Sequence, residues 1–164
     1  MFSLELKNFE SSKIFEDNLY NLIKSYEYPP IFLCIGTSKC LQDCFGSLCG
    51  TALKKQSNFL VFGSLKHEIT ARNFLKSYQF IKKNNTNNPI VIIDNVLIKN
   101  SFNTKAILKN GGVCPNGIFS DICIGDISIL VNGFSYNKFT TINNYKNIYK
   151  IILNTIKKLK YCFE

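Results

Sequence analysis

The chain has 164 residues, of which 46% are hydrophobic and 19% charged, a composition that excludes a disordered chain and suits one compact domain over residues 1–164. The longest apolar run falls short of the roughly 18 to 20 residues of a membrane span, and the first residues lack the apolar segment of a signal peptide. The net charge is +9, but Arg72 is the single arginine, so we expect neither a nucleic-acid nor a membrane partner.

The first half of the chain alternates helical and strand-like segments. Apolar residues at helical spacing predict an amphipathic helix over residues 12–26, with Ser11 or Ser12 as its N-cap, and Tyr28-Pro29-Pro30 ends it. The segments that follow are a strand over 31–35, a helix over 43–54, a strand over 59–62, a helix over 68–82 and a strand over 90–93. This alternation predicts a parallel sheet with right-handed crossovers, so the fold class is α/β.

The second half of the chain is less regular. Residues 105–108 are expected to form a further strand, and residues 111–117 a glycine-rich loop. Residues 126–131 form a strongly apolar strand between two glycines. Residues 145–159 predict a closing amphipathic helix with isoleucines on one stripe and lysines opposite.

Two aspartates lie near the ends of predicted strands. Asp43 follows the strand over 31–35 and stands at the start of a predicted helix, so it is either an N-cap or a site residue. Asp94 directly follows four apolar residues, where a carboxylate is costly unless it is paired, solvated or functional. Ligands of open α/β sheets gather outside the carboxyl ends of the strands, which favours a site role for Asp94.

The segment Gly36-Thr37-Ser38-Lys39 follows the same strand as Asp43. Such a loop could hold an anion with its backbone N–H groups. It matches neither the phosphate-binding GxxxxGK[ST] pattern nor the dinucleotide-binding GxGxxG pattern. A plain connecting loop in front of a helix is the alternative reading.

The chain has seven cysteines. An odd number of cysteines, in a sequence without a recognisable signal peptide, favours reduced thiols in the cytoplasm. Cys34 and Cys123 lie in apolar runs and are expected to be core side chains. Cys40, Cys44 and Cys49 flank Asp43, but their spacing fits no common zinc module.

His67 is the single histidine. It lies in a polar loop and nothing nearby in the sequence pairs with it, so we expect a surface side chain. One histidine cannot build a two-histidine metal site, and no GxSxG elbow accompanies it. We therefore expect no metal and no cofactor, and a carboxylate pair is the simplest catalytic arrangement.

Five short segments stand out by their order and spacing. They are Ile35-Gly36-Thr37-Ser38-Lys39 with Asp43-Cys44-Phe45-Gly46-Ser47-Leu48-Cys49-Gly50, Phe62-Gly63-Ser64-Leu65, Ile92-Ile93-Asp94, Gly112-Val113-Cys114-Pro115-Asn116-Gly117, and Gly125-Asp126-Ile127 with Val131-Asn132-Gly133-Phe134. In this order they resemble the YyaC-type sporulation proteins of endospore-forming bacteria, and the similarity runs from about Ile31 to Phe139.

That family is similar in fold to the spore germination protease and to hydrogenase maturation endopeptidases. The resemblance implies a three-layer α/β/α sandwich with a mostly parallel central sheet, of the phosphorylase/hydrolase-like type. The two presumed catalytic aspartates of the germination protease carry over to Asp43 and Asp94. In the hydrogenase peptidases acidic residues and a histidine bind nickel, and here no histidine matches the third ligand.

The loop around Asp43 departs from the family pattern. Ser38-Lys39 stands where the family has Asp-Arg, Gln42 replaces a glycine and Ser47 replaces a proline. We therefore hold two hypotheses. The first is a sporulation-associated peptidase in the cytoplasm of the sporulating cell or forespore, with Asp43 and Asp94 catalytic and Gly36, Thr37, Ser38 and Lys39 lining the site for a protein or peptide substrate. The alternative is a non-catalytic binding or adaptor protein on the same fold.

Overall fold

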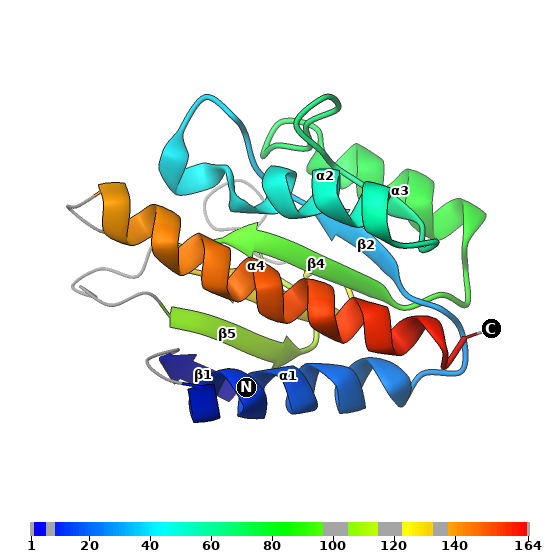
Figure 1. Ribbon diagram of the computed structural model, residues 1–164. Coiled ribbons are helices and arrows are strands. Elements are labelled where there is room, and N and C mark those ends of the chain that lie inside the picture. Colours follow the sequence, from blue (N-terminus) through cyan, green and yellow to red (C-terminus); the bar gives the residue numbers. More distant parts are fainter. Residues whose placement is uncertain (1, 6–8, 97–104, 115–122, 133–137, 164) are drawn as a thin grey trace.

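The computed structural model describes residues 2–5, 9–96, 105–114, 123–132 and 138–163. Helices and strands alternate along most of this length (Figure 1). The elements in chain order are β1 (Phe2–Glu5), α1 (Phe9–Lys24), β2 (Ile31–Cys34), the 3-10 turn η1 (Leu41–Asp43), α2 (Phe45–Gln56), β3 (Val61–Phe62), α3 (Phe74–Asn84), β4 (Ile90–Asn95), β5 (Lys105–Asn110), β6 (Ile127–Val131) and α4 (Lys138–Lys160).

The described strands form one six-stranded sheet in the order β1-β5-β6-β4-β2-β3. Strands β3, β2, β4 and β6 pair in parallel, and β5 lies antiparallel between β6 and β1. Among these strands β5 alone therefore runs against the common direction. The expected α/β fold with a mostly parallel sheet is confirmed, and helices cover both faces as a three-layer arrangement requires.

The two faces of the sheet carry separate cores. On β4, Val91 and Ile93 pack with α1, α2 and α4, whereas Ile90 and Ile92 pack with α3. Successive strand residues point to opposite faces, so a strand that is apolar at every position is buried on both sides. Figure 1 views the sheet from the side of α1, α2 and α4, with α3 behind.

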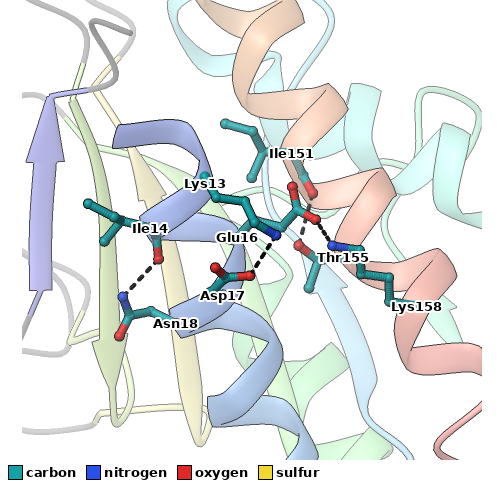
Figure 2. Close-up of polar contacts among 8 residues, drawn as sticks. All are labelled: Lys13, Ile14, Glu16, Asp17, Asn18, Ile151, Thr155 and Lys158. Carbon is teal, nitrogen blue, oxygen red and sulfur yellow. Dashed lines mark hydrogen bonds and ion pairs between the residues drawn. The ribbon is translucent and has the colours of Figure 1, made fainter. Parts of the chain in front are cut away.

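Helices α1 and α4 lie side by side on the first of these faces (Figure 2). Lys158 of α4 donates to the Glu16 carboxylate of α1, and within α1 Lys13 donates to Asp17 at 3.0 Å. Thr155 is buried between the helices and donates to the Ile151 carbonyl at 2.9 Å. Within the described residues, every helix falls short of the combined length and apolarity that crossing a membrane demands.

One strand was missed, and several element ends differ from those expected from the sequence. Strand β1 was missed, because the alternation of Phe2 and Leu4 is too short to distinguish it from a loop. Helix α1 begins at Phe9, so neither proposed serine caps it. Helix α3 begins at Phe74 rather than at residue 68, because the Asn73 side chain accepts from the Thr70 N–H at 2.7 Å and holds that segment as a turn.

Candidate active site

The N-terminus of α2 lies against the carboxyl ends of β2 and β4, and Gly46 permits this contact. A Cβ atom at Gly46 would lie 1.9 Å from the Ile35 carbonyl oxygen and 2.8 Å from the Ile93 carbonyl oxygen. Any side chain there would push the helix away from the strand ends. Glycine at this position therefore decides how close α2, and the turn before it, come to the end of the sheet.

Asp43 lies in that turn and is not a helix cap. It is the last residue of η1, and α2 follows with Cys44 as an N-cap whose side chain makes no capping hydrogen bond. The Asn95 side chain instead accepts from the Phe45 N–H at 3.1 Å. The cap interpretation of Asp43 was wrong, because the chain makes one more tight turn before the helix begins.

Asp43 and Asp94 line the same cavity of about 160 Å³. Asp43 arrives from the turn after β2 and Asp94 from the carboxyl end of β4, and both side chains are half-buried. The rest of the wall is largely apolar and consists of Ile35, Ala71, Phe74, Asn95, Val113 and Ile124. Two carboxyl groups in a small, mostly apolar cavity can hold different protonation states.

The surroundings of the two carboxyl groups give them different pKa values. Burial raises the pKa of Asp94 to about 7, opposed by the hydrogen bond from the Asn95 N–H and reinforced by the charge of Asp43. Burial, and after it the charge of Glu68, raises the pKa of Asp43 by a smaller amount. Asp43 loses its proton first, while Asp94 is still neutral, and Asp94 then titrates beside a charged neighbour. Near neutral pH the cavity holds an ionised Asp43 and a partly protonated Asp94.

The loop of residues 36–39 lies outside the wall of this cavity. Its backbone N–H groups are engaged within the protein: those of Gly36 and Thr37 donate to the Ile69 and Asp43 carbonyls, at 2.8 Å each, and that of Lys39 to the Thr37 hydroxyl at 3.3 Å. The anion-binding interpretation of this loop is therefore wrong in this conformation. The loop instead supports the turn that carries Asp43.

Glu68 is the acceptor that organises this loop, and it was not among the site residues expected from the sequence. Its carboxylate accepts from the Thr37 hydroxyl at 2.9 Å and from the Ser38 N–H at 2.6 Å. The Ser38 side chain, the Ser38 N–H and the Thr37 hydroxyl together lower the pKa of Glu68. Glu68 therefore stays ionised and adds negative charge on the Asp43 side of the cavity. No local sequence pattern distinguishes it from other acidic residues at predicted helix starts.

Asn95 is a second residue that sequence reasoning missed. Its side chain accepts from the Phe45 N–H and donates to the Tyr145 hydroxyl at 2.8 Å. The Tyr145 hydroxyl in turn donates to the Gln42 carbonyl at 3.3 Å. One side chain next to Asp94 thus joins β4, the start of α2, α4 and the turn before Asp43. The sequence hint was an amide directly after Asp94 at the end of a buried strand.

The segments behind the cavity are joined by a disulfide between Cys114 and Cys123. This corrects two expectations, because Cys123 is exposed rather than a core side chain and these two thiols are not reduced. Their neighbours Val113 and Ile124 exchange backbone hydrogen bonds of 2.9 Å and both line the cavity. Part of the expected glycine-rich loop, residues 115–117, lies outside the described residues. Cys34 is fully buried, as expected.

The implied nickel ligands do not fit this cavity. His67 is exposed, its N–H donates to the Ser64 carbonyl, and it is not among the residues that line the cavity. Across the described ranges, no three His, Cys, Asp or Glu side chains gather in a way that could hold a metal ion.

The chain is similar in structure to the crystal structure of a NiFe hydrogenase maturation protease, HycI, from Thermococcus kodakarensis KOD1. The TM-score is 0.55 at 13% sequence identity, and the match covers 85% of this chain and 99% of that one. At this identity the likeness shows the fold, which is the one that the sequence resemblance implied. No match was found among curated proteins. Residues 3–160 match the family described as "Protein of unknown function (DUF1256)", and the chain belongs to that family.

Proposed function

We propose that this protein is a hydrolase that cleaves a peptide bond with Asp43 and Asp94 as its carboxylate pair, and that it acts in the cytoplasm of the sporulating cell or forespore. The observation that carries the catalytic part is that both side chains line one cavity, where burial raises the pKa of Asp94 to about 7. The similarity in fold to a protease supports the reaction class, and the sequence resemblance to sporulation proteins supports the setting.

The two carboxyl groups divide the work of hydrolysis. The ionised Asp43 accepts a proton from a water molecule, whose oxygen attacks the carbonyl carbon of the scissile bond. The protonated Asp94 donates its proton to the carbonyl oxygen, which gives a neutral tetrahedral intermediate. When this collapses, the C–N bond breaks, the nitrogen takes the proton from Asp43 and the new carboxyl group returns one to Asp94. Both groups end as they began.

Asp94 donates the hydrogen bond to the carbonyl oxygen that backbone N–H groups donate in many hydrolases. The N–H groups of the 36–39 loop are engaged with protein acceptors, so they are not available to a developing oxyanion in this conformation. A neutral carboxylic acid in an apolar wall can donate a hydrogen bond to that oxygen instead. The raised pKa of Asp94 keeps this donor protonated up to about neutral pH.

The test compares the wild type with Asp43→Asn and Asp94→Asn in extracts of sporulating cells, with mass spectrometry of new peptide termini. Asp17→Asn is the matched control, because Asp17 is exposed on α1 and lies away from the cavity. Thermal unfolding of each variant checks that it is folded. We expect new termini with the wild type and the control and none with either cavity variant. Equal cleavage by a folded cavity variant would refute the pair.

A second candidate function is non-catalytic binding of a protein partner. The engaged loop donors favour it, because none of the N–H groups of residues 36–39 is free to stabilise an oxyanion. In that case the extracts yield no new termini with any form of the protein, while the same partner is captured by wild type and by the double Asp→Asn variant.

A further inference from the structure

A groove of about 540 Å³ lies between α2 and α4. Its volume falls in the range of roughly 300 to 1,000 Å³ that is typical of ligand pockets. Its walls are mostly apolar and consist of Leu41, Phe45, Leu48, Thr51, Ala52, Lys55, Gln56, Leu65, Ile142, Tyr145, Lys146 and Tyr149. We propose that this groove binds an acidic segment of the protein substrate through two or three of that segment's large apolar side chains.

The apolar part of the argument rests on exposure. Leu48, Leu65 and Ile142 are 39%, 41% and 40% exposed, and all three line the groove. They come from α2, from the loop after β3 and from α4, so distant parts of the chain bring them together. Large apolar side chains that gather in one hollow, rather than singly over the surface, are typical of a surface that a partner covers.

The charge of the groove selects the occupant. Lys55 and Lys146 line it, and no described lining residue is acidic. The sequences of α2 and α4 contain no Asp or Glu at all, although the chain as a whole has 11. An acidic segment is therefore attracted to both walls, whereas a second copy of this chain, with a net charge of +9, is repelled.

The groove adjoins the candidate active site. In the turn η1, Leu41 lines the groove and Asp43 lines the cavity. Phe45 and Tyr145, whose ring centroids are 5.0 Å apart, line the groove and are both held by the Asn95 side chain, which also borders the cavity. A segment seated in the groove thus leads past η1 to the two carboxyl groups. The claim that the occupant is a substrate rests on the proposed function. The claim that the groove prefers an acidic segment with apolar side chains is independent of that function.

The test measures binding by fluorescence anisotropy with a labelled synthetic peptide that has leucines at helical spacing and glutamates elsewhere. Two further peptides replace the glutamates by lysines or the leucines by serines. The protein carries Asp43→Asn and Asp94→Asn, so that no peptide can be cleaved by the pair. We expect the acidic leucine peptide to bind at least about tenfold more tightly than either counterpart, and less tightly as the salt concentration rises.

Groove variants are compared with matched controls on that background. Leu48→Ser and Leu65→Ser each weaken binding by about tenfold, whereas Leu60→Ser and Phe80→Ser, at positions 52% and 61% exposed and outside the groove, leave it unchanged. Lys55→Glu with Lys146→Glu reverses the preference toward the lysine peptide. Lys76→Glu, exposed on α3, does not.

The outcomes separate the two proposals. The groove proposal is overturned if the acidic leucine peptide does not bind, or if groove and control variants lose equal affinity for it. This holds whether or not new termini appear in the extracts. Binding with the expected pattern, together with no new termini in the extracts, supports the groove and refutes the hydrolase. New termini that Leu48→Ser and Leu65→Ser leave unchanged support the hydrolase and overturn the groove as its substrate site.

Discussion

Asp94 and Asn95 are neighbours in β4 and serve opposite faces of the sheet. Both residues line the cavity, which Asp94 shares with Phe74 of α3, but the Asn95 side chain also bonds to Phe45 of α2 and Tyr145 of α4. This follows from the two-residue period of a strand. A single dipeptide therefore supplies one carboxyl group of the candidate site and the joint that fixes the elements around it.

Replacing Asn95 should loosen this joint without touching either carboxyl group. Asn95→Ala leaves the Phe45 N–H without its acceptor, so we expect a loss of about 1 to 3 kcal/mol in the free energy of unfolding. Tyr145→Phe removes one hydroxyl and keeps the ring contact with Phe45, and should cost about 1 kcal/mol. Urea titration measures both. A loss for Asn95→Ala no larger than that for Tyr145→Phe would contradict the capping role of Asn95.

The stability of the wild type should fall as the pH rises toward neutrality. Because the folded-state pKa of Asp94 is about 7 and the unfolded value is about 3.9, the folded protein holds more protons between these values. Stability is then lost with rising pH over that window, by about 1.4 kcal/mol for each pKa unit at most, and levels off above it. Asp94→Asn should remove this fall and be the more stable protein at pH 8. Asp17→Asn should keep it.

Substitution of Gly46 separates helix propensity from packing. Propensity alone favours alanine over glycine inside a helix by about 1 kcal/mol. The close approach of a Cβ atom to the Ile35 carbonyl predicts the reverse, and we expect Gly46→Ala to lose at least about 1 to 3 kcal/mol in the free energy of unfolding. Gly111→Ala is the comparison, because a Cβ atom there would meet only the Lys109 side chain, at an ordinary contact distance of 3.9 Å, and its cost would come from the φ of +113°. Unchanged or raised stability of Gly46→Ala would contradict the tight contact.

The sequence predicted the elements that carry their own pattern. The runs over β2, β4 and β6 are apolar at nearly every position, and such runs mark strands buried on both faces. Helices α1, α2 and α4 were found with shifted ends. The late start of α3 was not foreseen, because it depends on the Asn73 side chain and on contacts between Glu68 and the 36–39 loop. Those contacts join segments that are far apart in the chain.

In the candidate site too, features with a local sequence pattern were predicted and features that depend on distant contacts were not. Local spacing indicated that Asp43 and Asp94 lie at strand ends, and the family resemblance joined them. Neither could show that Asn95 would take the capping role, or that Glu68 would engage the loop expected to line the site. The disulfide between Cys114 and Cys123 could not be predicted from the sequence either. The two cysteines stand in segments whose pairing depends on the β-bridge between Val113 and Ile124.

If the carboxyl pair is catalytic, its pH profile should be bell-shaped. The values of kcat/KM report the free enzyme, so the alkaline limb should fall near pH 7, where Asp94 loses the proton that it donates. The acid limb should lie at a higher pH than the usual pKa range of aspartate, because burial and the charge of Glu68 raise the pKa of Asp43. Glu68→Gln should move the acid limb to lower pH and leave the alkaline limb in place. An alkaline limb that moves instead would contradict the assignment of Asp43 as the base.

Reduction of the disulfide should destabilise the wall behind the cavity. In the chain-entropy account, a loop of the size closed by Cys114 and Cys123, which are 9 positions apart, contributes about 2 to 3 kcal/mol. A dithiol reductant should therefore lower the unfolding temperature of the wild type. It should have no such effect on the Cys114→Ser, Cys123→Ser double variant, which keeps the five free cysteines. Alkylation of free thiols followed by mass spectrometry shows whether the bond is present in each sample. An equal response of the two proteins would place the effect of the reductant elsewhere.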